Sequence, residues 1–411
     1  MIFLFYVVSA LGIWFFFFKR RRFDFVSAAF IGSMIYFLPG YYGRVFNPYQ
    51  VDKLPNDPIF HGTYAVWTIA LLSFIIAGFF YNPKSIHFKI PRTSQKLDIV
   101  ILVLLAVSFI MTLSQSGDVL YNPDKDAVLA GLDRSYILFS TMTQFSFVVF
   151  FVQRKYFLWI PAAASMAFIV FVGFRSELAN SVIAIMTLFA RKHGIREYFK
   201  IKFAIPTFFT AIFLFVYKSI YIAVKMGRGD LVQNFFGNGG GVQSSIFKSE
   251  PFITQTILNE VLARDFSVKF SYFVHSFLAI LPFSNKVLGI NNYALGFHFQ
   301  EYLFPTVRYG MASNIYAHWY AALGVPGIII FLFLLNFALI AVSKFVENPS
   351  RSFMWYAVVL IGAFLAFYIN RNDVAYSITS MTRLAYVGLA ILFISKVWET
   401  FARGGEGPPR T

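Results

Sequence analysis

The chain has 411 residues, of which 58% are hydrophobic and only 13% charged, a balance that argues against a water-soluble fold. Its formal net charge of +16 is compatible with nucleic-acid binding, but the positions of the basic residues fit a membrane surface instead. The absence of cysteine excludes disulfides, thiolate metal ligands and cysteine nucleophiles.

Apolar runs long enough to cross about 30 Å of hydrocarbon recur along the whole chain and predict an all-α polytopic membrane protein with a single membrane domain, 1–411. We expect eleven spans, at residues 2–18, 25–41, 64–80, 98–113, 136–152, 157–173, 176–190, 203–221, 323–343, 353–369 and 384–398. Their apolar runs do not alternate as the strands of a membrane barrel do. The first span is not a signal peptide, because its basic run follows the apolar stretch.

The basic residues divide unequally between alternate connections. Twenty lie in the connections that include 19–22, 84–96 and 191–202, and in the C-terminal tail, whereas the short connections on the other side carry seven. Positively charged connections stay in the cytoplasm, so the N-terminus is predicted outside and the C-terminus inside. In a bacterium this places the chain in the inner membrane, with a periplasmic N-terminus.

One long connection, 222–322, lies outside in this topology, before the last three spans. Its apolar residues recur at helical spacing over 266–281, which predicts an interfacial amphipathic helix. A re-entrant lid, or a helix that only covers the bundle, is the alternative. The glycine-rich stretch 235–241 predicts a flexible turn whose amides can cradle phosphate.

Acidic residues crowd another outer connection, around Asp124 and Asp126. Paired carboxylates suit a divalent metal, as in many lipid-dependent glycosyltransferases, but a solvated acidic loop is the commoner meaning. The chain has no zinc-protease, P-loop or serine-hydrolase motif.

Arginines near the expected outer ends of the spans form the first candidate site. They are Arg175, Arg228, Arg264, Arg308, Arg371 and Arg383. The planar guanidinium group binds phosphate oxygens in a bidentate manner, so convergent arginines suit a lipid diphosphate. A five-residue turn, 173–177, holds Arg175 between two spans. For any one arginine the alternative is snorkelling to the interface.

The stretch 313–320, where the external connection ends, forms the second candidate site. A helix over 314–344 would be about 45 Å long, so its first turns project beyond the hydrocarbon. Asn314 and His318 lie one turn apart, and glycines and a proline at 324–327 predict a bend below them. His318 can accept a proton from a sugar hydroxyl; the alternative is a histidine within an aromatic belt.

These stretches resemble the bacterial oligosaccharide repeat-unit polymerases, the Wzy-type O-antigen polymerases, which are distantly related to the O-antigen ligases. Residues 173–178 are similar to the G-x-R-S/G-x-L signature of the polymerases. Ser313, Asn314 and Tyr316, with two glycines after them, are similar to the element that ends the large external loop. The position of the long loop before the last spans is also similar.

The resemblance implies a metal-independent glycosyltransferase of the GT-C kind, without a cofactor, in which undecaprenyl diphosphate carries both the donor and the acceptor glycan. It implies catalytic roles for Arg175, His318 and Glu177. It implies diphosphate or glycan binding by Arg228, Arg264, Arg308, Asn314, Tyr316 and Arg371. The ligases have a histidine where this chain has Ser313, so the general base stays open among His318, Glu177 and Asp373.

The product would be O-antigen, capsule or exopolysaccharide, made with a chain-length regulator, a flippase and a ligase as partners, and without nucleic acid. A flippase for lipid-linked glycans is an alternative function from another class. It would need charged residues deep within its spans, which the sequence hardly has. A ligase of the same superfamily is the closer alternative.

Overall fold

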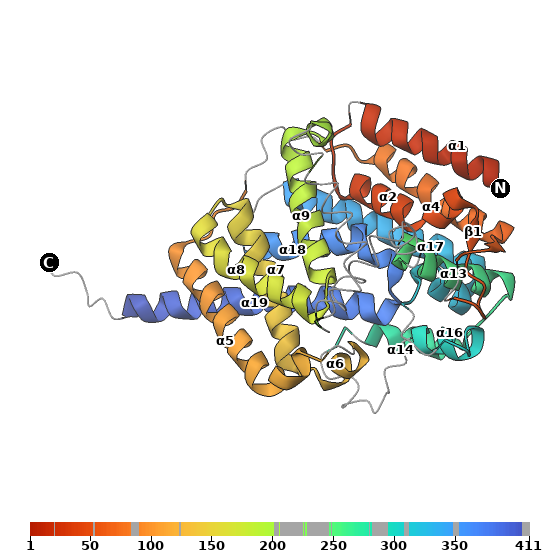
Figure 1. The fold of residues 1–411 in the computed structure, drawn as a ribbon. Coiled ribbons are helices and arrows are strands. Elements are labelled where there is room, and N and C mark those ends of the chain that lie inside the picture. Colours follow the sequence, from red (N-terminus) through yellow and green to blue (C-terminus); the bar gives the residue numbers. More distant parts are fainter. Residues whose placement is uncertain are drawn as a thin grey trace.

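The computed structural model describes residues 1–19, 21–51, 54–83, 90–122, 125–200, 205, 225, 227, 246–247, 249–278, 280–281, 295–307, 312–347 and 353–404. These residues are almost entirely helical. Strands are limited, within these ranges, to a two-residue antiparallel pair, β1 (Arg44–Val45) and β2 (Asp57–Pro58). The all-α class expected from the sequence is confirmed (Figure 1).

The first half of the bundle contains α1 (Ile2–Ile13), η1 (Trp14–Phe18), α2 (Phe25–Tyr36), α3 (Leu38–Tyr42), α4 (His61–Phe80), α5 (Gln95–Leu120), α6 (Lys125–Gly131), α7 (Arg134–Val152), α8 (Tyr156–Val172), α9 (Ser176–His193) and η2 (Ile195–Phe199). The second half contains α13 (Glu250–Ala263), α14 (Phe270–Leu278), α16 (Leu295–Leu303), α17 (Ile315–Glu347), α18 (Met354–Ala366), η3 (Tyr368–Arg371) and α19 (Val374–Gly404).

Five of the described helices are long and apolar enough to cross a membrane: α4, α5, α7, α17 and α19. The apolar segments of α1 with η1, α2, α8 and α18 are shorter. Helices fall on ten of the eleven expected spans, and the remaining one, 203–221, lies outside the described residues except for residue 205. The chain therefore has the apolar helices of a multi-pass membrane protein.

The helix α9 differs from the expectation of a purely apolar span. It is amphipathic, and it buries Asn180, Ser181 and Thr187 on the side that packs against α7 and α18. The Asn180 amide donates to Gln144 on α7 (3.1 Å). The segment is therefore less apolar than expected because it carries buried polar side chains that connect it to a neighbouring helix.

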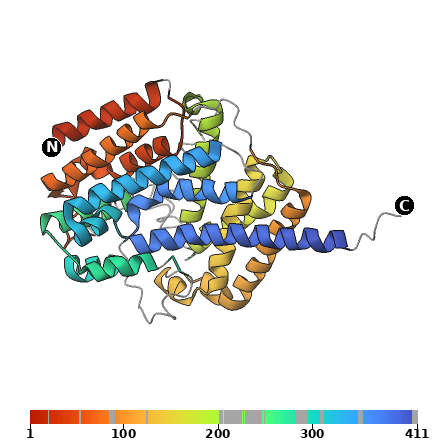
Figure 2. The ribbon, with the colours of Figure 1, turned by 180° about the vertical axis from the view of Figure 1, so that it is seen from behind.

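The helices pack into one bundle in which α2 and α17 contact α4, α18 and each other. The helices α5, α7 and α8 pack together, and α19 runs along α5, α7 and α18 (Figure 2). Large apolar side chains stay exposed on the outside, among them Phe79, Phe157, Phe333 and Phe393. Exposed phenylalanines over several helices fit a lipid-facing surface.

Helix ends that carry basic residues meet at one end of the bundle. Tyr81, just after α4, donates to Glu347 at the end of α17 (2.6 Å), and Arg191 at the end of α9 pairs with the same carboxylate (2.8 Å). Arg21, just before α2, pairs with Asp24 (2.8 Å) and donates to the Tyr81 carbonyl (2.9 Å). Connections that are far apart in the sequence therefore share one end, as the alternating basic runs predict.

The opposite end holds the described helices of the long connection. In Figure 1 the N-terminus lies at this end with β1, α13 and α16, and the C-terminus lies at the other side of the molecule. The indole of Trp67 on α4 donates to Gln255 on α13 (2.7 Å), and the Asn259 amide oxygen accepts from the Phe60 backbone (2.8 Å). These contacts fix α13 on the end of the bundle.

Two local expectations for this end are confirmed. A helix, α14, forms within the predicted stretch and buries Phe273 while Phe270, Val274 and Phe277 stay exposed. The backbone of α17 leaves the helical region at Gly324 (φ 64°, ψ −152°), which is the predicted bend. Glycine adopts this left-handed φ at little cost, so the residue type explains where the bend occurs.

Candidate functional site

Arg175 lies in the tight turn between α8 and α9. Gly173 ends α8 with a left-handed φ of 112°, and Arg175 is the residue immediately before α9. The ring of Phe174 packs on Tyr136 (5.1 Å between ring centroids). The Lys225 ammonium donates to the Val172 carbonyl at the end of α8 (3.2 Å). The backbone that carries Arg175 is therefore held from both sides.

Arg371 ends η3, the short helical turn between α18 and α19. This turn packs against α2, α13, α17 and α18. The backbone amide of Ser313 donates to the Arg371 carbonyl (3.0 Å). The preceding residue, Asn370, accepts on its side-chain oxygen from the hydroxyls of Tyr316 (3.1 Å) and Ser33 (3.3 Å). Buried hydrogen bonds thus fix the backbone on which Arg371 stands.

Glu250, the first residue of α13, brings the two arginines together. Its Oε1 atom lies 2.7 Å from Nη2 of Arg175 and 2.8 Å from Nη1 of Arg371. The three side chains are 19–25% exposed, so the cluster is partly open to solvent. We call Arg175, Glu250 and Arg371 the arginine cluster. Charged groups at this depth interact more strongly than on an open surface.

The Arg371 guanidinium group stays charged at neutral pH. Burial lowers the pKa of Arg371, but the facing Glu250 carboxylate and the phenols of Tyr36, Tyr368 and Tyr376 together outweigh burial, and the pKa is raised above its ordinary value. The positive charge at the cluster therefore comes from the two guanidinium groups.

Three buried donors at or next to the arginine cluster have no hydrogen-bond acceptor. They are Nε of Arg371, Oγ of Ser249 and Oγ of Ser313. Ser249 directly precedes Glu250, and Ser313 is bonded to Arg371 through its backbone. A buried donor without an acceptor costs about 1–3 kcal/mol, so such groups mark places where an oxygen-rich ligand gains hydrogen bonds.

Glu177 is the carboxylate of the first candidate motif. It lies in the first turn of α9, partly buried, and accepts from the Ser176 hydroxyl (2.9 Å). It follows Arg175 by two residues along the chain. Glu177 therefore lies within electrostatic reach of the arginine cluster.

His318 occupies a different environment from the one expected of a group that accepts a proton from a sugar hydroxyl. The side chain is fully buried, and Nδ1 accepts from the backbone amide of Val374, the first residue of α19 (3.2 Å). Phe273 packs edge-on against the imidazole (5.7 Å). His318 therefore caps the start of α19, because the first amides of a helix need acceptors from outside the helix.

The polar residues around His318 are also engaged inside the protein. Asn314 is buried, accepts from the Ala317 amide at the start of α17 (3.1 Å) and donates to the Thr254 carbonyl on α13 (3.1 Å). Tyr316 is buried and bonded to Asn370, and Asp373 accepts from the amide of Tyr376 (2.7 Å). The stretch expected to bind substrate instead supports the turn that carries Arg371.

Arg264 is not brought to the arginine cluster, although the sequence suggested one shared cavity. It follows α13, whereas Glu250 begins it, and this 14-residue helix spans about 20 Å. Arg264 pairs with Glu260 one turn earlier (3.0 Å) and lies over the ring of Tyr49 (5.9 Å). The four-residue spacing of Glu260 and Arg264 explains this pair, which holds Arg264 at the other end of α13 from the arginine cluster.

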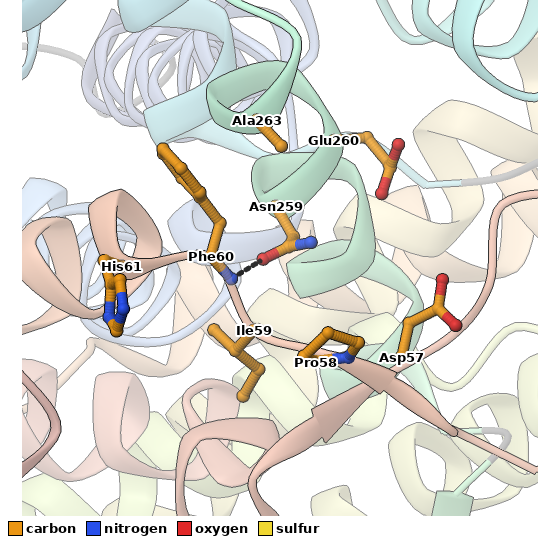
Figure 3. Close-up of a pocket in the computed structure, with 8 residues that line it drawn as sticks. All are labelled: Asp57, Pro58, Ile59, Phe60, His61, Asn259, Glu260 and Ala263. Atoms are coloured by element: carbon orange, nitrogen blue, oxygen red, sulfur yellow. Dashed lines mark hydrogen bonds between the residues drawn. The ribbon is translucent and has the colours of Figure 1, made fainter.

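An open cavity of about 360 Å³ lies beside that second ion pair (Figure 3). Its lining residues are Asp57, Pro58, Ile59, Phe60, His61, Asn259, Glu260 and Ala263. Figure 3 shows Asp57 and Glu260 on one side of Asn259 and His61 on the other. Two carboxylates repel a diphosphate, so the arginine cluster is the better anion site.

Other expected residues fall outside the described part of the chain. Arg228, Arg308 and Asp124 are among them, as are the glycine-rich stretch and the side chain of Asp126. Among the residues that are described, no group of three or more histidine, aspartate or glutamate side chains could hold a metal ion. The chain matches no family model, no curated protein and no solved structure.

Glu250 is the residue of the site that sequence reasoning missed. It is a single carboxylate in a long connection without a motif, and its partners are 75 and 121 positions away in the sequence. The only local signal is its place in front of Pro251, since acidic residues and proline are both favoured in the first turn of a helix. That signal predicts a helix start and no partner.

Proposed function

We propose that this chain polymerises oligosaccharide repeat units linked to undecaprenyl diphosphate on the outer face of the bacterial inner membrane. The growing glycan moves from its carrier onto a new repeat unit, in the synthesis of O-antigen, capsule or exopolysaccharide. The proposal combines the sequence resemblance with the arginine cluster. The convergence of Arg175 and Arg371 from separate parts of the chain is the observation that carries it.

The proposed topology has eleven spans, a periplasmic N-terminus and a cytoplasmic C-terminus. Two features support it: basic helix ends meet at one end of the bundle, and the N-terminus lies with α13 at the other. The arginine cluster involves the first residue of α13, so this topology puts it at the outer headgroup level. A diphosphate attached to a membrane lipid sits at that level.

In the proposed reaction the bond between the anomeric carbon and the diphosphate oxygen breaks, and the electron pair stays on the diphosphate. The arginines stabilise this developing charge, a role that metal ions have in many other glycosyl transfers. The acceptor hydroxyl forms the new bond to the anomeric carbon, and its proton passes to a carboxylate. We assign the proton to Glu177, because His318 and Asp373 are buried and engaged as helix caps.

The test is to incubate the purified protein with a lipid-linked repeat unit and to separate the products by size. The proposal expects a ladder of longer lipid-linked glycans, formed equally with and without a chelator. A flippase would move the substrate between leaflets without lengthening it, and a ligase would transfer a glycan to a different acceptor lipid. A single product of unchanged length would contradict the proposed function.

A further inference from the structure

One carboxylate oxygen holds both arginines of the site. Oε1 of Glu250 accepts from Arg175 and Arg371, although each guanidinium group can bind two oxygens at once. A diphosphate offers more oxygens and more negative charge than a carboxylate. Arg371, whose Nε atom has no acceptor, therefore has capacity for a stronger anion than the one that it holds here.

The unsatisfied donors support this view independently. Nε of Arg371 is buried without an acceptor, and the hydroxyls of Ser249 and Ser313 are buried without a partner. A permanent structural ion pair gains nothing from leaving these donors unpaired, since each costs stability. They would be explained if a second state of the site supplies the missing oxygens.

We infer that Glu250 is a positioning residue that holds Arg175 and Arg371 in the empty site and is exchanged for the diphosphate of the substrate. The inference rests on the proposed function and deepens it. In the empty site the carboxylate keeps two like charges close together, which would otherwise repel each other. When the diphosphate binds, it takes over the two guanidinium groups, and the Glu250 side chain turns away.

The anchoring of α13 makes this exchange a local event. Past its first turn, the helix is fixed by Gln255 to Trp67 (2.7 Å) and by Asn259 to the Phe60 backbone (2.8 Å). The Asn314 amide also donates to the Thr254 carbonyl (3.1 Å). The effect of releasing Glu250 is thus confined to the first turn of α13, while the rest of the helix stays in place.

The test measures binding of inorganic diphosphate to the full-length protein in nanodiscs by calorimetry. Glu250→Gln keeps the size of the side chain and removes the competing charge, so the diphosphate should bind at least about tenfold more tightly. The matched control is Glu260→Gln, which removes the acid of an arginine pair at the other end of the same helix. Its affinity for diphosphate should equal that of the wild type.

Amide hydrogen exchange of the wild type gives a second measurement that needs no variant. Adding diphosphate should speed exchange in the first turn of α13, after Glu250, and leave the turn around Asn259 unchanged. Equal or weaker binding by Glu250→Gln, or unchanged exchange in the first turn, would overturn the exchange and leave the arginine site standing. If the wild type and the variant both fail to bind diphosphate, and also fail to bind farnesyl diphosphate, the proposed function itself is wrong.

Discussion

The arginines of the cluster should depend on the shape of the guanidinium group as well as on its charge. Arg371→Lys and Arg175→Lys keep the positive charge but lose bidentate contact with phosphate oxygens. Removal of one partner of a developing oxyanion typically costs about 10²–10³ in rate. We therefore expect each variant to make short products or none in the ladder assay.

The control for these variants is Arg44→Lys. Arg44 is exposed at the same end of the bundle and donates to the Asn56 carbonyl (3.1 Å), away from the cluster. Its lysine variant should make ladders of normal length. Normal ladders from both cluster variants at wild-type protein abundance would remove Arg175 and Arg371 from the site.

Substitutions of His318 test whether this buried histidine supports the structure or takes part in the reaction. In His318→Ala the amide of Val374 loses its acceptor, which should lower the free energy of unfolding by about 1–3 kcal/mol. His318→Gln supplies a side-chain acceptor and should recover part of this loss. Thermal unfolding in detergent measures both. An alanine variant that is as stable as the wild type but inactive would make His318 the general base.

Sequence patterns found the cationic half of the site and missed its anionic half. The short turn indicates Arg175 and the place near an outer helix end indicates Arg371, whereas the local signal of Glu250 predicts a helix start and no partner. Arg264 was grouped with them on charge and expected topology alone. In the structure Arg264 pairs with Glu260, four residues earlier, and does not join the cluster, because a local partner is reached before a distant one.

The turn between α8 and α9 should be sensitive to a single methyl group. Gly173 has a φ of 112°, where an L side chain is strained by about 1–2 kcal/mol. Gly173→Ala should lower the unfolding temperature and also shorten the products, because it displaces the backbone two residues before Arg175.

Gly117→Ala is the matched change inside a helix. A Cβ at Gly117 of α5 meets no atom within 4 Å, and alanine is favoured over glycine in a helix by up to about 1 kcal/mol. Its stability should therefore equal or exceed that of the wild type. Equal stability and equal products for both glycine variants would show that the turn does not hold Arg175 in place.

Long apolar runs made most helices predictable, and a glycine made the bend of α17 predictable. The helix α13 was not predicted, because it is buried on nearly all sides and includes Gln255, Asn259 and Glu260 in its packed surface. Neither an apolar run nor an amphipathic period marks such a helix. The polar interior face of α9 likewise depends on partners on α7 and α18, which sequence alone does not supply.

For the chain as a whole, the absence of native cysteine makes the topology directly measurable. Glu301→Cys places one exposed thiol on α16, and Lys96→Cys places one at the start of α5, near the basic end. A membrane-impermeant maleimide should label the first in intact spheroplasts and the second only after lysis. The reverse pattern would place the arginine cluster in the cytoplasm and end the proposed reaction.

The most direct measurement is the structure, by electron cryomicroscopy, of the protein in nanodiscs with a lipid-linked repeat unit bound. We expect phosphate oxygens at about 3 Å from the guanidinium groups of Arg175 and Arg371, with the Glu250 carboxylate withdrawn from both. A diphosphate bound elsewhere, with the ion pairs from Glu250 to both arginines intact, would contradict the proposed role of the arginine cluster.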